Sequence, residues 1–65
     1  MDVVINGEHK QISGGTLLDV LQELELDPRA VVVEHNRKIV RRPALNEVRV
    51  ASGDAIEVVH FVGGG

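Results

Sequence analysis

The chain has 65 residues, no cysteine and a formal net charge of −3 at pH 7. This length suits one small domain, and without cysteine neither disulfides nor zinc–thiolate sites can stabilise it. The acidic balance gives no reason to expect nucleic acid as a partner, and the apolar runs are far shorter than the roughly 20 residues of a membrane span. Because the first residues also lack the pattern of a signal peptide, we expect a cytoplasmic protein.

The first residues predict a hairpin. Met1, Val3 and Ile5 recur at every second position, which is typical of a strand with one buried face. Asn6-Gly7 is a strong signal for a type I′ turn, because both central residues of that turn need a positive φ. We expect residues 8–12 to return as the antiparallel partner.

An amphipathic helix follows the hairpin. Thr16 and Asp19 have the spacing of a capping box at its start. Apolar side chains then recur along a single stripe, at Leu17, Val20, Leu21 and Leu24. Asp27-Pro28 is expected to end the helix, because a residue that precedes proline is driven out of the α region.

Short extended segments complete the chain. They are expected at 30–34, 39–40 and 55–62, with 44–47 as a loop or one helical turn. The first and last strands are both apolar enough to be neighbours at the centre of the sheet, and that pairing would be parallel. The predicted fold class is therefore α+β: a mixed sheet of four to five strands with one main helix packed across it, the β-grasp arrangement.

The two faces of the last strand differ. Ile56 and Val58 lie on one face and are expected to meet the helix. The residues expected to point away, next to the end of the chain, are Val59, Phe61 and Val62. Phe61 is the only aromatic residue of the chain. Two interpretations stay open: an exposed surface for contact with another protein, or a second small core under residues 39–43.

Three glycines end the sequence and have no side chain to bury. They also lose the most entropy when ordered, so they predict a thin extended tail, 63–65, attached to a folded domain, 1–62. In this interpretation Gly63 and Gly64 provide reach, and the carboxylate of Gly65 is the reactive group. The alternative is a frayed end or a cloning remnant.

The rest of the sequence offers no constellation for catalysis, so we expect no catalytic residue and no metal site. Three histidines lack the spacing of metal ligands: His9, His35 and His60. Three acidic residues are spaced four apart and predict an exposed helix face rather than an acid–base pair: Asp19, Glu23 and Asp27.

Positive charge gathers in one short stretch, at Arg37, Lys38, Arg41 and Arg42. One interpretation is a solvated turn and sheet edge, where charge blocks edge-to-edge aggregation. The other is a docking surface for an acidic partner. No aromatic residues interleave with these charges, which argues against nucleic acid.

The end of the sequence carries the most specific pattern. Gly53-Asp54-x-Ile56-Glu57-Val58-Val59, followed by Val62-Gly63-Gly64-Gly65, resembles the ThiS family of sulfur carriers in thiamine biosynthesis, which have a ubiquitin-like β-grasp fold. Weaker matches run through nearly the whole chain. One departure is Val40-Arg41-Arg42-Pro43, where the family often has Val-Pro-Arg; Arg42 is then the counterpart of the family's loop arginine.

This resemblance implies a chemistry for Gly65. An adenylating enzyme of the ThiF type uses ATP to convert the Gly65 carboxylate into an acyl-adenylate, and sulfur from a cysteine desulfurase then displaces AMP. Thiazole synthase takes the sulfur from the resulting thiocarboxylate. The chain itself would bind no cofactor and would be a substrate rather than an enzyme. We expect its partners to contact the following residues: Val59, Phe61, Val62, Arg41 and Arg42.

Three alternatives remain at this point. The nearest is a sulfur carrier of the same design that serves molybdopterin synthesis or another thiolation pathway. The second is a ubiquitin-like modifier, whose Gly65 would form isopeptide bonds to lysines. The third is a β-grasp interaction module with an idle tail.

Overall fold

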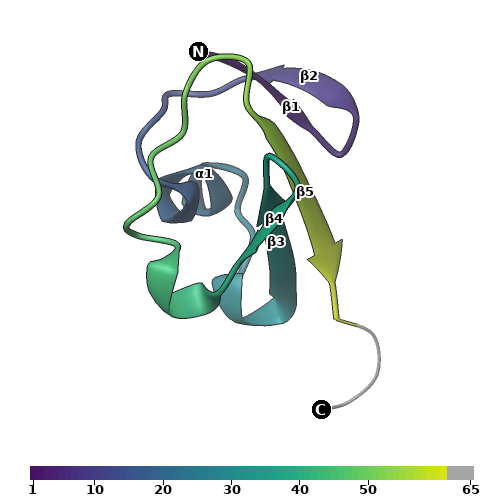
Figure 1. Ribbon diagram of the computed structural model, residues 1–65, viewed down its shortest axis with the longest axis vertical. Coiled ribbons are helices and arrows are strands. Elements are labelled where there is room, and N and C mark those ends of the chain that lie inside the picture. The colour runs from purple at the N-terminus through teal and green to yellow at the C-terminus, as the bar shows by residue number, and fades with distance from the viewer. Residues whose placement is uncertain (62–65) are drawn as a thin grey trace.

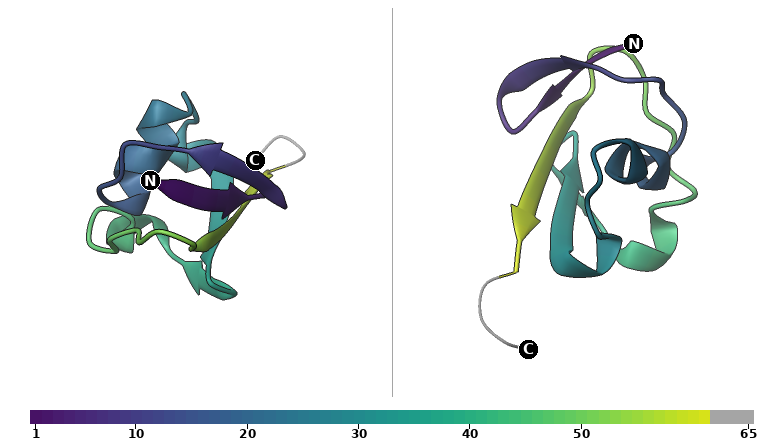
Figure 2. Two further views of the ribbon diagram at one scale, coloured as in Figure 1. Left: turned by 90° about the horizontal axis from the view of Figure 1, so that it is seen from above. Right: turned by 180° about the vertical axis from the view of Figure 1, so that it is seen from behind.

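The computed structural model describes residues 1–61 and contains one mixed sheet of five strands, in the order β2-β1-β5-β3-β4. The strands are β1 (Asp2–Ile5), β2 (Glu8–Gln11), β3 (Val31–His35), β4 (Lys38–Val40) and β5 (Ala55–His60). Helix α1 (Leu17–Glu23) covers one face, while the short 3₁₀ helices η1 (Pro28–Ala30) and η2 (Arg42–Ala44) lie at one end (Figures 1 and 2). The predicted β-grasp arrangement is confirmed.

Strand β5 occupies the centre of the sheet. It pairs in parallel with β1, where Ile5 is opposite Ile56, and antiparallel with β3, from Val31–His60 to His35–Ile56. The predicted parallel pairing of the first and last strands is therefore confirmed. β5 ends at His60 rather than at Val62, which lies outside the described residues.

Two tight turns connect neighbouring strands. Asn6 and Gly7 have φ values of 51° and 82°, as the predicted type I′ turn requires. Asn36 and Arg37, with φ values of 49° and 72°, make a similar turn between β3 and β4. β3 begins at Val31, one residue later than predicted, because η1 takes up the three residues before it.

The start of α1 follows the predicted capping box. The Asp19 N–H donates to Thr16 Oγ1 at 3.2 Å, and the Thr16 N–H donates to Asp19 Oδ2 at 2.9 Å. Gly15 precedes this cap with a φ of +101°, and a Cβ at this position would collide with the Asp19 carboxylate. The cap therefore requires glycine before Thr16.

The predicted end of the helix at Asp27-Pro28 is wrong. α1 ends at Glu23, with Leu24 as its C-cap. Glu25 then adopts a left-handed φ of 59°, and the Leu26 N–H donates to Leu21 O at 2.8 Å. Together with the bond from the Glu25 N–H to Gln22 O at 3.1 Å, this bond forms a Schellman motif, which usually has glycine where this chain has Glu25. Leu26 packs against the core, so burial of its side chain stabilises the early stop.

The predicted acidic helix face is therefore wrong for Asp27, which lies beyond the helix. Each of the three carboxylates instead accepts a local backbone hydrogen bond. Asp19 caps α1, Glu23 accepts from the Ser13 N–H at 3.0 Å, and Asp27 accepts from the Arg29 N–H at 2.9 Å. Side-chain and backbone hydrogen bonds from Arg29 hold the pKa of Asp27 below its usual value. These contacts support a structural role for all three residues.

The core lies between α1 and the sheet. Its buried residues are all aliphatic: Val3, Ile5, Ile12, Leu17, Val20, Leu21, Val31, Val33, Leu45, Val50, Ile56 and Val58. Leu45 and Val50 come from the long connection between β4 and β5. This connection is bonded to the start of the helix, since the Leu18 N–H donates to Leu45 O at 3.0 Å and the Val50 N–H donates to Gly15 O at 2.9 Å.

Candidate functional site

Strand β5 has one buried face and one exposed face. Ile56 and Val58 are buried against the helix side, as predicted. On the other side Val59 is 60% exposed and Phe61 is 63% exposed. The second of the two interpretations, a small core that buries Phe61, is therefore wrong.

Neighbouring strands extend this exposed apolar surface. Val32 on β3 is the direct cross-strand partner of Val59, and Ile39 on β4 is 66% exposed. Both lie on the face of the sheet opposite the helix. We define the outer apolar patch as the residues Val32, Ile39, Val59 and Phe61. Contiguous exposed apolar side chains of this kind mark protein contact surfaces.

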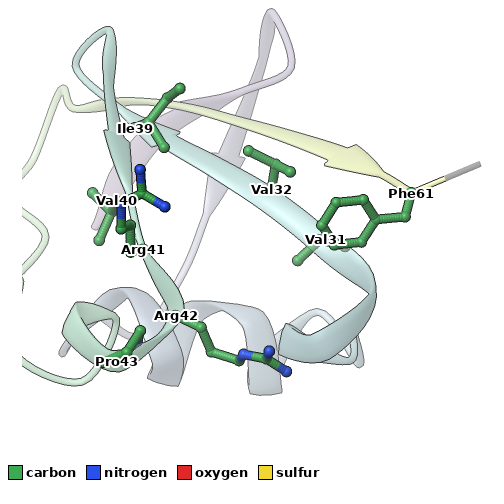
Figure 3. Close-up of a pocket in the computed structure, with 8 residues that line it drawn as sticks. All are labelled: Val31, Val32, Ile39, Val40, Arg41, Arg42, Pro43 and Phe61. Atoms are coloured by element: carbon green, nitrogen blue, oxygen red, sulfur yellow. The ribbon is translucent and has the colours of Figure 1, made fainter. Parts of the chain in front are cut away.

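A groove of about 460 Å³ runs along one side of the outer apolar patch. It is lined by Val31, Val32, Ile39, Val40, Arg41, Arg42, Pro43 and Phe61 (Figure 3). Phe61 lies at one end and η2 at the other. The groove therefore combines an apolar floor with two guanidinium groups.

The four positive charges of residues 37–42 do not form one cluster. Arg37 and Lys38 lie at the β3–β4 turn, whereas Arg41 and Arg42 follow the other end of β4, in the groove beside Phe61. In Figure 3 the Arg41 side chain lies along β4, and the Arg42 side chain extends from η2 towards η1. Arg42 also contributes, after Arg29, to the lowered pKa of Asp27. Only the second pair of charges joins the candidate site.

An acidic pair borders the outer apolar patch on the side away from the tail. Glu34 on β3 and Glu57 on β5 are direct cross-strand partners. Neither forms an ion pair within residues 1–61. Directly opposed like charges destabilise a sheet, so the repulsion between these two carboxylates lowers the stability of the fold. The exposed face thus carries an acidic pair in addition to the outer apolar patch and the two arginines of the groove.

Two of the three histidines, His9 and His35, lie beside carboxylates. His9 lies 3.1 Å from Asp2, and His35 lies 2.7 Å from Asp54. Within residues 1–61 no three potential metal ligands come together. In the same part of the chain no helix is long and apolar enough to cross a membrane.

Asp54 organises the end of the sheet at which β5 begins. Partial burial opposes its ionisation, but hydrogen bonds from the Ala51 N–H, His35 and Asn36 outweigh burial and lower the pKa of the Asp54 carboxyl. Asn36 also accepts a hydrogen bond from the Ala55 N–H at 2.9 Å. These contacts fix the start of β5 and hence the register of the strand that carries the patch.

Four predicted site residues lie outside the described residues: Val62, Gly63, Gly64 and Gly65. Their roles stay predictions. The structure adds Val32 and Ile39, which the sequence interpretation missed. Only the strand register brings these two beside Val59, and a chain read in order gives no signal of that register.

Comparisons with known proteins agree on one family. The model of the ThiS family matches residues 3–65. The sulfur carrier protein ThiS of Bacillus subtilis is 43% identical over 51 residues, which cover 78% of this chain and 77% of that protein. A crystal structure of the thiamine biosynthesis protein ThiS from Geobacter metallireducens is similar over the full length of both chains, with a TM-score of 0.87 and 29% sequence identity.

Two larger proteins also match. Thiazole synthases from Paramagnetospirillum magneticum and Magnetococcus marinus are each 42% identical over 66 residues. The match covers all of this chain but 20% of each thiazole synthase. The chain thus spans about a fifth of the length of these relatives.

Proposed function

The chain belongs to the ThiS family, and from this premise we propose that it is a sulfur carrier in thiamine biosynthesis. The observation that carries the proposal is the family match, which runs from residue 3 through the glycines to Gly65. Similarity to a Bacillus protein named as a sulfur carrier supports it. We also propose a cytoplasmic location, as the expected use of ATP suggests.

The proposed chemistry takes place on the carboxylate of Gly65. A carboxylate is a poor acylating group, and adenylation by a ThiF-type partner supplies a leaving group. The carboxylate oxygen attacks the α-phosphorus of ATP and releases pyrophosphate. The terminal sulfur of a persulfide from a cysteine desulfurase then attacks the acyl carbon and releases AMP, which leaves an acyl disulfide. A thiolate of the partner attacks the outer sulfur of that disulfide, forms a new disulfide with it, and releases Gly65 as a thiocarboxylate. ATP would be bound by the partner, so no side chain of this chain needs to be catalytic.

We assign docking to the outer apolar patch together with Arg41 and Arg42. Burial of the exposed Val59 and Phe61 side chains on a partner supplies affinity, and arginine charges beside a groove steer an acidic partner surface. The adenylating enzyme is the first partner and thiazole synthase the second. The two thiazole synthases that contain a segment similar to this chain support the second assignment.

Intact mass spectrometry tests the proposed function. The chain is incubated with the adenylating enzyme, ATP and a sulfur donor, and the expected product has one oxygen replaced by sulfur at Gly65. A variant without Gly65 is the matched control and should gain no sulfur while keeping its melting temperature. Conjugates of higher mass would instead indicate a ubiquitin-like modifier. An unchanged mass would exclude both functions.

Thiazole formation separates the pathways. The thiocarboxylate form should support thiazole synthesis when mixed with thiazole synthase and its other substrates. If it transfers sulfur only to a molybdopterin precursor or to tRNA, the chain serves one of the other thiolation pathways.

A further inference from the structure

The central strand β5 has a neighbouring position on each side. The backbone N–H and C=O groups of successive residues point alternately to one side and to the other. The Asn36 N–H donates to Ala55 O at 2.8 Å, and the Phe61 N–H donates to Ala30 O at 2.9 Å. In an antiparallel ladder every second residue bonds to the neighbour, so Ala55, Val59 and Phe61 direct their backbone groups towards β3. The even-numbered residues of β5 direct theirs the other way.

The residue after β1 bonds to the first of these outward groups. The Asn6 N–H donates to Ile56 O at 2.9 Å. At the next even position the Asn6 side chain replaces a strand: the Val58 N–H donates to Asn6 Oδ1 at 2.7 Å, and Asn6 Nδ2 donates to Val58 O at 3.2 Å. Among residues 1–61, the amide of Asn6 is therefore the last group that bonds to this side of β5.

His60 is the next even-numbered residue. By the same alternation its N–H and C=O point away from β3, and nothing within residues 1–61 bonds to them. Figures 1 and 2 show the end of β5 with β3 on one side and no other described segment on the other. A free donor and acceptor thus lie at the base of the tail, between the exposed side chains of Val59 and Phe61.

We propose that an extended strand of the adenylating enzyme pairs with β5 at His60 and adds to the sheet beyond Asn6. This inference rests on the proposed function, because it assigns the contact to the partner that activates Gly65. An extended backbone offers the donor and acceptor that the His60 peptide groups lack. Its side chains would lie beside Val59 and Phe61 on the outer face.

The other exposed edges of the sheet carry more polar and charged side chains. β2 consists of exposed polar residues, and on β4 the exposed Ile39 has Lys38 before it and Arg41 two residues after it. Polar and charged side chains on an edge strand oppose pairing with another chain. The β5 edge lies instead between an exposed valine and an exposed phenylalanine. This contrast selects the edge at His60 as the pairing site.

Proline variants test the main-chain contact. His60→Pro removes the free N–H but no hydrogen bond within the chain, and proline is tolerated on strand edges. His60→Ala controls for the imidazole. His9→Pro is the matched control, because the Ile12 N–H bonds to Met1 O and the alternation leaves the His9 N–H on the open edge of β2. His60→Pro should weaken binding to the adenylating enzyme about three- to tenfold, whereas the other two variants should bind like the unsubstituted chain.

Amide hydrogen exchange of the unsubstituted chain gives a second readout that does not depend on any variant. The His60 amide should exchange fast in the free chain and become protected in the complex, while the Phe61 amide is protected in both. Protection of His60 together with the selective loss in His60→Pro supports the inference. A His60 amide that stays unprotected, or equal affinities of His60→Pro and His60→Ala, overturns it. A chain that gains no sulfur overturns the proposed function, and this inference with it.

Discussion

His35 Nε2 and Asp54 Oδ2 lie 2.7 Å apart across the start of the central strand, and both side chains are largely buried. The same carboxylate accepts a hydrogen bond from the Ala51 N–H at 2.8 Å. One ionised group thus joins β3, the preceding turn and β5. The register of the exposed patch depends on this junction.

Asp54→Asn is expected to lower the free energy of unfolding at pH 7 by about 1–3 kcal/mol, because it replaces a hydrogen-bonded charge with a neutral group. The pKa of Asp54 is lowered in the fold, so its contribution is complete above the unfolded value of about 3.9 and is lost as the pH falls through the folded pKa. Urea unfolding between pH 7 and pH 2 measures both effects. The variant should lose less stability in acid than the unsubstituted chain, and an equal loss would contradict the assignment.

Asn6→Gly is expected to cost about 1–3 kcal/mol, because it removes two hydrogen bonds to Val58 while glycine keeps the positive φ of the turn. Asn6→Asp keeps an acceptor for the Val58 N–H, so its free energy of unfolding should lie between those of Asn6→Gly and the unsubstituted chain. Chemical denaturation of the three proteins measures the order. A glycine variant as stable as the unsubstituted chain would show that the Asn6 amide does not hold β5.

Phe61→Asp should raise the Kd for the adenylating enzyme at least tenfold, because it places a charge in the outer apolar patch. The melting temperature should stay nearly unchanged, since Phe61 is exposed. Ser52→Asp adds the same charge in an exposed turn and should bind normally. Calorimetric titration and thermal unfolding test the pair, and unfolding of Phe61→Asp would show that Phe61 belongs to the core.

Charge reversal in the two halves of the basic stretch should affect association with the adenylating enzyme differently. Glutamate at both Arg41 and Arg42 should slow association with the adenylating enzyme several-fold at low salt, and the effect should shrink as salt rises. Glutamate at both Arg37 and Lys38 changes the net charge equally but lies at the other end of β4. Equal slowing by both double variants in stopped-flow measurements would mean that net charge alone matters.

Local signals predicted much of the fold. Asn6-Gly7 predicted the first turn, and Thr16 with Asp19 predicted the helix start. The alternation of residues in β5 predicted that Val58 is buried and that Val59 is exposed. Each feature depends on residues close together in the chain, so elementary stereochemistry suffices.

Features set by distant contacts were not predictable in this way. The helix stops early because Glu25 takes a left-handed φ while Leu26 packs on the core. Ile39 joins the patch only through strand register, and the length of β4 separates charges that are close in sequence. Tertiary burial decides these points and leaves no periodic pattern.

The outer apolar patch draws Val32, Ile39 and Val59 from three different strands. None of these strands forms the patch alone, and the connection between β4 and β5 is hydrogen-bonded to the start of the helix. A partner that recognises the patch therefore recognises the completed sheet. If the adenylating enzyme docks on the patch as proposed, an unfolded or misregistered copy has the same glycines but no patch, and activation would then favour chains that have finished folding.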